Sequence, residues 1–461
     1  MPRILHSISI VSTMLVAFPA MVAAQVAAGG GGSPGASQIF STSPRFMLKL
    51  FTRPGVELTS TQRRTRDELW RQEIRNELFV PPKLPPLQTH LWSTFSPAPG
   101  VLADRVTYAT ADGMRVPAII YRPDPLVYHW RGKLPGIVIV NGHGGDKFSW
   151  YAFYSGVLFA RAGSVVVTYD PIGEGERNHD RLSMENPSTH DAVVDLPYWG
   201  QRLAGLMQAD LMQGVSYLRE QPQVDHTRIA IAGYSMGAFI SGIAGAIDLR
   251  IHAVLLSGGG TFDGPGEYFD AGKLPCQAAP YRALGVLGDR SAILFALNAD
   301  RGPMYIMNGD VDEVMRMSEH PPTWFAEVRA RAAVLNGSNR NLFITKLYPG
   351  VGHRPSWVEL AGVLWLNHQL HFALWSDQDI LAAGTTHISE WVNANHVAIS
   401  KNYIVEAREG GLRAVGAGFP GIQRSNLMVL PEAEWQREKP ILTYESWAER
   451  EKVFEEGGST P

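Results

Sequence analysis

A serine between two glycines stands where a strand-like segment meets a helix-like one. The pentapeptide Gly233-Tyr234-Ser235-Met236-Gly237 directly follows the apolar run 228–232 (RIAIA) and opens a run of small residues. A serine on a sharp strand-to-helix turn needs glycine on each side, because a larger side chain would collide with the strand or the helix. The turn exposes the hydroxyl beside unpaired N–H groups at the helix start. This context predicts that Ser235 is a nucleophile; the alternative is a glycine-rich turn with an incidental serine.

A serine hydroxyl becomes a good nucleophile only when a base removes its proton. His353 lies in a short glycine-rich loop after the apolar run 342–347, where we expect the carboxyl end of a strand. His320, which stands beside two prolines, is the weaker alternative. His179 and His190 lie in a polar segment, where we expect them to face solvent or line a rim. Placement therefore favours His353 as the general base.

The base in turn needs a carboxylate that fixes its tautomer and stabilises the imidazolium. Asp310 and Asp312 both follow the strand-like run 304–307. We assign the acid to Asp312, with Asp310 as the alternative. The other aspartate would then cap a turn or a helix.

The segments that carry these residues belong to an alternation of short apolar runs and longer helical ones. A turn at Asp112-Gly113 first joins two strand-like runs, 106–110 and 115–121, as in a β-hairpin. Near-continuous apolar strands separated by helices are typical of a parallel sheet covered on both faces. The sequence therefore predicts an α/β fold with a mostly parallel central sheet. The expected strands are 134–140, 164–169, 228–232, 251–256, 304–307 and 342–347, and the expected helices are 150–162, 196–220, 238–247, 324–335 and 357–370.

The chain order Ser235, Asp312, His353 resembles that of the α/β-hydrolase superfamily. The resemblance covers about residues 101–375, and Gly309 stands three residues before Asp312, a spacing common in the superfamily. The run from Asp170 to Gly175 (DPIGEG) is similar to the Asp-x-x-Gly-x-Gly loop of acetylxylan-esterase-like and dienelactone-hydrolase-like members. That loop is either a structural turn or a substrate contact. The resemblance implies the α/β-hydrolase fold and a serine esterase.

In this superfamily two backbone N–H groups bind the oxyanion of the tetrahedral intermediate. The resemblance places one of them at Met236, directly after the nucleophile. It places the other in the loop Asn141–Asp146 (NGHGGD), after the first long apolar strand. We assign this second donor to Gly144 or Gly145, and we expect His143 to brace the loop.

Three differences from related families narrow the choice of enzyme class for this chain. Dienelactone hydrolases use a cysteine where this chain has Ser235, and glucuronoyl esterases carry an arginine where it has Met236. Prolyl-oligopeptidase-type peptidases carry an N-terminal β-propeller, for which the segment before residue 101 is too short. We expect a secreted carboxylesterase that acts through an acyl-enzyme, with acetylated xylan or another carbohydrate ester as the substrate class. The alternatives are a serine peptidase or amidase of prolyl-oligopeptidase-like type, and a non-enzymatic binding protein with the hydrolase fold.

Both ends of the chain fall outside the alternation of predicted strands and helices. Arg3, the apolar run 8–20 and a small-residue site before Gln25 are typical of a cleaved secretory signal peptide. The single cysteine, Cys276, would leave an exported chain without an internal disulfide. We expect a secreted or periplasmic bacterial protein. The expected segments are a signal peptide (1–24), a flexible linker (25–40), an N-terminal helical arm (41–100), the hydrolase domain (101–375) with an insertion and candidate lid (259–303), and a C-terminal extension (376–461).

The expected arm contains one clear helix signal. Thr65 and Glu68 have the spacing of a capping box, and Trp70, Ile74 and Leu78 then recur every four residues on one face. We interpret this helix as a packing arm on the hydrolase domain.

Composition and charge argue against several partners. The formal charge is −3 with acids and bases well mixed, so no basic surface for nucleic acid is expected. No stretch after the signal is long and apolar enough to cross a membrane. Neither zinc-ligand spacing nor a calcium loop is present, so we expect no metal and no organic cofactor. The expected partner is a small-molecule or carbohydrate ester.

Overall fold

The computed structural model describes residues 47–48, 51–52, 57–181, 190–194, 196–260, 283–317, 323–337, 342–397 and 412–453. All the helices and strands given below belong to the unit Phe51–Pro461. The expected signal peptide and linker, the alternative base His320, and Cys276 lie outside the described residues.

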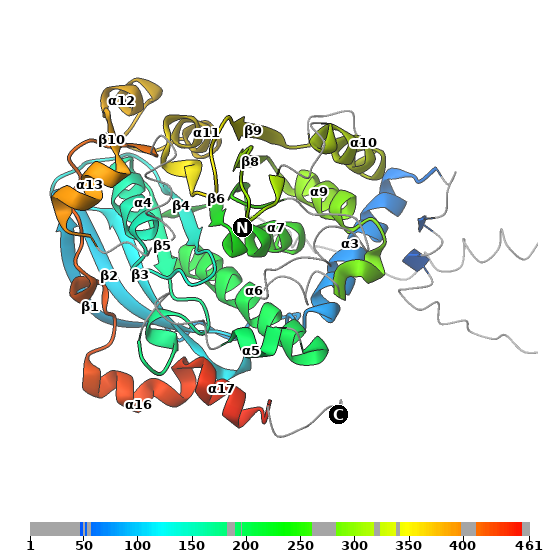
Figure 1. Cartoon of the computed structure of the whole chain (residues 1–461), viewed down its shortest axis with the longest axis horizontal. Coiled ribbons are helices and arrows are strands. Elements are labelled where there is room, and N and C mark those ends of the chain that lie inside the picture. Colours follow the sequence, from blue (N-terminus) through cyan, green and yellow to red (C-terminus); the bar gives the residue numbers. More distant parts are fainter. Residues whose placement is uncertain are drawn as a thin grey trace, which may run out of the picture. The chain divides into compact units, whose positions relative to one another are not determined.

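Within the described residues, nine strands form one sheet in the order β1-β2-β3-β5-β4-β6-β7-β8-β9 (Figure 1). The pairs β1/β2, β2/β3 and β3/β5 are antiparallel, whereas every pair from β5 to β9 is parallel. The predicted, mostly parallel sheet is therefore confirmed. The strands are β1 (His90–Ala98), β2 (Val101–Ala109), β3 (Arg115–Pro123), β4 (Leu134–Val140), β5 (Val165–Tyr169), β6 (Val224–Tyr234), β7 (Ala253–Ser257), β8 (Met304–Gly309) and β9 (Ile344–Tyr348), with a separate pair of β10 (Thr385–His387) and β11 (Arg413–Val415).

Helices cover both faces of the sheet, and alternate residues of β4 show which face each helix takes. Ile137 and Ile139 belong to a core cluster that includes α4 and α11. Val138 points the other way, because it lies 3.3 Å from the Cβ that Gly214 of α6 would carry. The helices are α3 (Ser60–Glu77), α4 (Trp150–Arg161), α5 (Asp191–Val194), α6 (Pro197–Glu220), α7 (Met236–Ile247), α9 (Arg290–Arg301), α10 (Trp324–Asn336), α11 (Leu360–Leu370), α12 (Asp377–Ala382), α13 (Ile388–Asn395), α15 (Arg424–Leu427), α16 (Glu432–Leu442) and α17 (Tyr444–Arg450).

Strand order reverses beside β4, and this reversal creates the position for a site. The chain runs from β4 to β5 on one side and then crosses to β6 on the other side of β4. In open α/β sheets, ligands bind at such a point, beyond the carboxyl ends of the strands. Val140 at the end of β4 pairs with Gly233 near the end of β6, so the loop after β4 meets the turn after β6.

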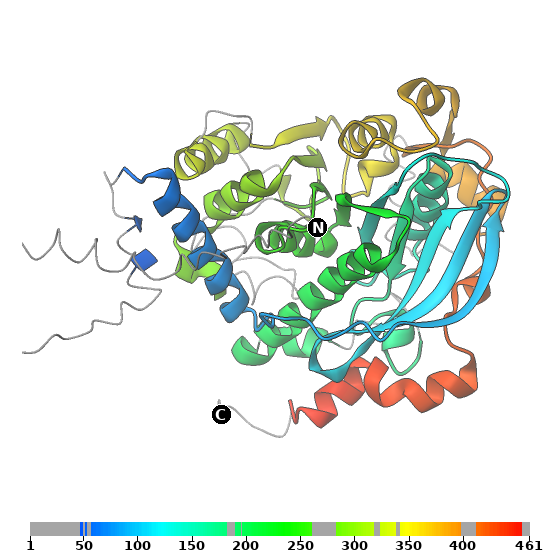
Figure 2. The same ribbon diagram turned by 180° about the vertical axis from the view of Figure 1, so that it is seen from behind.

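The expected helical arm at 41–100 is only partly helical. Residues 90–98 form β1, the edge strand beside β2, which appears with β2 and β3 as long light-blue ribbons in Figure 2. Its side chains are mostly exposed and it contains Pro97, as is typical of a sheet edge. An edge strand does not need an apolar run, which is why the sequence analysis did not predict it.

The helix predicted within the arm is present as α3, but its start was predicted wrongly. Its capping box is Thr59 with Gln62: the Thr59 hydroxyl accepts from the Gln62 N–H at 3.2 Å, and the Gln62 side chain accepts from the Thr59 N–H at 2.9 Å. Thr65 lies inside the helix, where its hydroxyl donates to the carbonyl of Thr61. Trp70 and the other apolar residues of this face are buried, as expected.

The expected insertion at 259–303 is also too long, because its last part belongs to the alternation of strands and helices. Residues 290–301 form α9, which packs on α7 and α10 and connects β7 to β8 as an ordinary crossover helix. Asp289 caps this helix, its carboxylate accepting from the Ala292 N–H at 3.1 Å. Residues 261–282 of the expected insertion and candidate lid lie outside the described residues.

The C-terminal extension packs against the flank of the hydrolase domain. Trp391, Phe419 and Trp435 belong to the same core cluster as α4 and α11. The Tyr154 hydroxyl of α4 donates to the carbonyl of Val415 at 2.9 Å. α16 packs against β3, and α17 lies at the turn before β3, where Arg450 donates to the Asp112 carbonyl (Figure 1). Among the helices of the described residues, none combines the length and the apolar character that a membrane crossing requires.

Candidate active site

Ser235 occupies a strained turn between β6 and α7. Its backbone angles are φ 54° and ψ −118°, and its N–H donates to the carbonyl of Ser257 at 3.0 Å. A Cβ on Gly233 would lie 2.1 Å from the carbonyl oxygen of Gly237, and one on Gly237 would lie 2.2 Å from that of Val140. Glycine is therefore required at both positions, because neighbouring backbone atoms come too close to leave room for a side chain. This is the arrangement expected for a nucleophile on a strand-to-helix turn.

His353 and Asp312 form a hydrogen-bonded pair at the carboxyl ends of β9 and β8. The imidazole Nδ1 lies 2.7 Å from Asp312 Oδ2, and the Asp312 carboxylate is fully buried. Its other oxygen accepts from the Met315 N–H at 2.9 Å. Asp310, the alternative acid, instead accepts from the Gly350 N–H at 2.7 Å. The geometry thus separates the two aspartates: one faces the histidine and one braces the turn after β9.

Tyr234 connects the nucleophile turn to the histidine. Its ring lies 4.8 Å from the His353 ring, and its hydroxyl donates to the His353 carbonyl at 3.3 Å. Gly258 also lies against the His353 imidazole, because a Cβ on Gly258 would be 2.9 Å from His353 Cε1. Its neighbour Gly259 lies against the Ser235 carbonyl. Ser235 and His353 are consequently held on the same small group of residues.

We expect the two aspartates to respond differently to removal of their charge. Asp312→Asn should lower kcat by about 10³–10⁴-fold, because an amide cannot stabilise the imidazolium or select its tautomer. Asp310→Asn keeps an oxygen for the Gly350 N–H and should leave kcat within about threefold. Ester turnover at saturating substrate measures both. Similar losses in the two variants would contradict the assignment of Asp312.

The loop after β4 lies directly beside Ser235. A Cβ on Gly142 would be 3.1 Å from the Ser235 Cβ. The Gly142 N–H donates to the Tyr151 hydroxyl at 3.1 Å, and the Gly145 N–H donates to the Gly142 carbonyl at 2.9 Å. Gly145 is therefore not available as an oxyanion donor, because its N–H is already used within the turn.

The other predicted donors differ in what surrounds them. The Gly144 N–H is hydrogen-bonded to the Glu174 carboxylate, although burial still raises the pKa of that carboxyl well above its ordinary value. Met236 is the first residue of α7, where the N–H has no partner within the helix. Among the described residues, the backbone N–H of His143 makes no hydrogen bond either. Among the described residues, Met236, and His143 as the residue after Gly142, are therefore the candidate donors in place of the two glycines.

A buried ion network fixes this loop. The Lys147 ammonium pairs with the carboxylates of Asp170 and Glu176, and all three side chains are fully buried. Asp170 also accepts from the Glu176 N–H at 2.9 Å. Gly175 has φ 55°, and a Cβ there would be 2.6 Å from the Asp170 carboxyl carbon. Of the two interpretations of the Asp-x-x-Gly-x-Gly loop, the structural turn accounts for these residues.

Glu176 carries the same network into the C-terminal extension. Its carboxylate accepts from the N–H groups of Val429 at 2.7 Å and Leu430 at 3.0 Å. Its carbonyl accepts from the Trp435 indole N–H at 2.9 Å. The extension therefore fixes the loop that pairs with Lys147, although its described residues supply no member of the Ser235 group.

Asp146 is a buried carboxyl group in the same loop. Burial and the nearby Asp170 carboxylate raise the pKa of Asp146 to about 7. An aspartate in an unfolded chain ionises near pH 4. Between these two values the folded state binds the proton more tightly than the unfolded state, so stability falls as the pH rises from about 4 to about 7.

We expect Asp146→Asn to remove this pH dependence. Asparagine keeps an oxygen for the Phe148 N–H, which Asp146 Oδ1 accepts at 2.7 Å, but it carries no charge. The variant should equal the native protein in Tm near pH 4 and exceed it by roughly 2–4 °C at pH 8. Thermal unfolding followed by circular dichroism across this range measures the difference. A difference that does not change with pH would contradict the expectation.

His143 and His190 belong to a cluster that the sequence analysis did not predict. His143 Nε2 lies 2.8 Å from Asp191 Oδ1, and His190 Nδ1 lies 4.0 Å from Glu174 Oε1. His190 is fully buried, contrary to the expectation that it faces solvent or lines a rim. Burial, together with the neighbouring His143, lowers the pKa of His190 to about 3. His143, Glu174 and His190 lie 16 to 47 positions apart along the chain, so no local spacing marks them.

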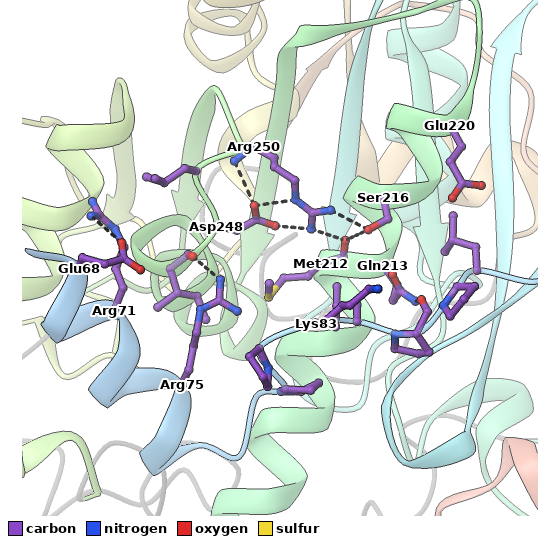
Figure 3. A pocket seen from close by; sticks show the side chains of 18 residues that line it. Glu68, Arg71, Arg75, Lys83, Met212, Gln213, Ser216, Glu220, Asp248 and Arg250 are labelled. Carbon is purple, nitrogen blue, oxygen red and sulfur yellow. Dashed lines mark hydrogen bonds and ion pairs between the residues drawn. The ribbon is translucent and has the colours of Figure 1, made fainter. Parts of the chain in front are cut away.

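A cavity of about 540 Å³ lies at the opposite end of α7 from Ser235. Figure 3 shows arginines of α3, the second half of α6 and the turn after α7 around it. The Arg250 guanidinium is hydrogen-bonded to the Asp248 carboxylate and to the Ser216 hydroxyl, and Arg75 donates to the Ile247 carbonyl. Because α7 is about 18 Å long at 1.5 Å per residue, this cavity is separate from the candidate active site.

Residues 137–410 match the model of the alpha/beta hydrolase family, which is more than half of the 461-residue chain. The chain belongs to this family. The fold and the strand-end positions of Ser235, Asp312 and His353 agree with that membership.

Comparison with individual proteins gives more distant similarities. The thiohydrolase apmlB of Arthrinium phaeospermum is 26% identical over 156 residues, which is 33% of this chain and 42% of that protein. The chain therefore spans less than half the length of this relative. The solved methylesterase BT1017 superposes with a TM-score of 0.54 at 16% identity, covering 89% of this chain and 79% of that one. An acetyl xylan esterase from Paenibacillus sp. R4 gives 0.45 at 17% identity, with coverages of 66% and 94%. The first of these structures shares the fold.

Proposed function

We propose that this chain is a serine carboxylic-ester hydrolase with Ser235 as nucleophile, His353 as general base and Asp312 as the acid that orients it. One observation carries the proposal: Asp312 and His353 are paired at 2.7 Å beside a serine that is held in a strained turn at the start of α7. Strain at a buried turn is retained where a side chain must be presented in one direction. The family membership supports hydrolysis as the reaction class.

The proposed reaction proceeds in two halves. Ser235 Oγ attacks the ester carbonyl while His353 Nε2 takes its proton, and the N–H groups of Met236 and His143 stabilise the oxyanion. The tetrahedral intermediate collapses, and His353 returns the proton to the leaving alcohol. Water then attacks the acyl-enzyme by the same route and releases the acid. We place the second oxyanion donor at His143 because the N–H groups of Gly144 and Gly145 are engaged elsewhere.

We propose an esterified carbohydrate as the substrate and export from the cell as the setting. The net charge of −3, the expected signal peptide and the Asp170 loop resemblance support this choice. Similar solved structures include a methylesterase and an acetyl xylan esterase. Mass spectrometry of the mature chain tests export: cleavage before Gln25 is expected, and recovery of an intact N-terminus from the exported fraction would contradict it.

Active-site labelling with a fluorophosphonate probe tests the nucleophile. The native protein should be labelled and Ser235→Ala should not; equal labelling would overturn the assignment. Acetylated xylan, methyl-esterified polysaccharide, p-nitrophenyl esters of increasing chain length and peptide anilides then separate the substrate classes. Turnover restricted to long acyl chains would exclude the carbohydrate ester, and turnover of anilides at rates similar to esters would favour the peptidase alternative.

A further inference from the structure

Three segments of the chain meet at the cluster beside the oxyanion loop. His143 comes from the loop after β4, Glu174 from the loop after β5, and His190 from the residue before α5. One nitrogen or oxygen from each of these side chains lies within 4.8 Å of the other two. Asp191 adjoins the cluster, with its Oδ1 2.8 Å from His143 Nε2 and 3.7 Å from His190 Nε2.

These separations are close to those of ligands around one metal ion. Nitrogen and oxygen atoms bound to zinc at about 2.0–2.1 Å in tetrahedral geometry lie about 3.3 Å apart. Of the distances above, 4.0 Å between His190 Nδ1 and Glu174 Oε1 is the longest that joins two named atoms. The three ligand atoms lie within 4.8 Å of one another, so closing the cluster around one ion requires movements of up to about 1.5 Å. Two imidazoles with one or two carboxylates suit Zn²⁺ and similar transition metals better than Ca²⁺ or Mg²⁺, which prefer oxygen ligands.

Glu174 gives a second and independent indication. The side chain is only 1% exposed, and its Oε1, the atom that faces His190, has no hydrogen-bond partner among the described residues. A buried carboxylate oxygen without a donor is costly. The buried ammonium of Lys147 is paired instead with Asp170 and Glu176. A cation between Glu174 and the two histidines would satisfy this oxygen.

Gly173 makes the close approach of these segments possible. It has φ 88°, and a Cβ there would lie 2.3 Å from His190 Nδ1. The backbone before Glu174 therefore lies directly against the imidazole, which no other residue type would allow.

We propose that His143, Glu174 and His190 form a binding site for one divalent transition-metal ion of the Zn²⁺ type, with Asp191 hydrogen-bonded to the His143 imidazole beside it. The site goes beyond the proposed esterase activity and takes no part in the covalent steps. Its place in the fold gives the ion a positioning role. It ties the loop after β4 to two other segments at His143, the residue whose backbone N–H is proposed to face the oxyanion.

Metal binding to the full chain tests this site directly. After removal of bound metal with a chelator, titration calorimetry should show one Zn²⁺ per chain, and Co²⁺ should give visible absorption of a bound ion. Saturating Zn²⁺ should raise Tm by roughly 2–5 °C. Glu174→Gln keeps the side-chain shape but removes the charge and should weaken Zn²⁺ binding by at least about 100-fold. His143→Gln, at a partly exposed side chain, tests the same site should Glu174→Gln fail to fold.

Two control variants show whether Zn²⁺ binds at this cluster and not at another histidine. His368 and Asp377 are also 2.7 Å apart, but on the surface, so His368→Gln should leave Zn²⁺ affinity unchanged. Ser235→Ala should bind Zn²⁺ as the native chain does, which makes the metal site independent of the proposed nucleophile. No binding of Zn²⁺, Co²⁺ or Mn²⁺, or equal binding by native protein, Glu174→Gln and His143→Gln, would overturn the proposal.

Discussion

Replacement of Ser235 by alanine is expected to lower kcat/KM for a p-nitrophenyl ester by at least about 10⁴-fold, with no loss of folded protein. The hydroxyl is the only group removed, and without it no acyl-enzyme can form. A residual rate from the oxyanion donors and from binding remains, so the loss is large but finite. Stopped-time assays at substrate concentrations below KM measure it. A variant that retains more than one hundredth of the native value would show that the nucleophile lies elsewhere.

The Ser235→Gly variant separates two effects of this residue: the loss of its hydroxyl group and the strain of its backbone. A non-glycine residue at φ 54° and ψ −118° costs about 1–3 kcal/mol, which glycine avoids. The glycine variant should therefore be as inactive as the alanine variant but more stable than it. Denaturant unfolding of both variants measures the difference. Equal stabilities would mean that the turn is not strained at this residue.

Replacement of Lys147 by methionine is expected to destabilise the protein by about 3–5 kcal/mol. Methionine fills much of the same volume but leaves the buried carboxylates of Asp170 and Glu176 without their shared cation. Removal of one partner from a buried ion pair costs far more than the pair contributes, because the remaining charge is stranded. Burial by itself would raise the pKa of Glu176, but the Lys147 ammonium holds this pKa below its ordinary value. Equilibrium unfolding in urea gives the change in free energy.

The matched control for Lys147 is an ion pair in contact with solvent. Arg331 Nε lies 2.7 Å from Asp289 Oδ2, and both side chains are more than a third exposed. Arg331→Met should change the free energy of unfolding by no more than about 1 kcal/mol. A Lys147→Met variant as stable as Arg331→Met would mean that the buried network does not support the fold. If Lys147→Met is insoluble while Arg331→Met expresses normally, the expectation also holds.

The strands and the candidate triad were predictable for the same reason. Fully buried strands need apolar runs, and parallel strands bring their carboxyl ends to one edge of the sheet. Ser235 and Asp312 each follow a buried run of this kind, and His353 follows the apolar run 342–347, so strand ends alone place them together. Their roles in catalysis stay predictions until the variants are measured.

The features missed by the sequence analysis lack a comparable local signal. An edge strand such as β1 carries no apolar run, and glycine and proline on either side of α9 made that helix look like part of a loop. Thr65 with Glu68 has the same spacing as Thr59 with Gln62, so the pattern could not choose between them. The burial of His190 depends on Gly173, 17 residues earlier in the chain, whose missing side chain leaves room for the ring.

The hydrogen bonds that Glu176 accepts from the extension also imply an order of assembly. Val429 follows Glu176 by 253 residues, so at 5–20 residues per second the ribosome makes this partner about 13–50 s later. During that interval the loop that carries Asp170 lacks the backbone donors of residues 429 and 430. We expect the nascent chain to remain without a finished active-site wall until this late segment docks. Synthesis and hydrolytic activity would then be separated in time within a single molecule.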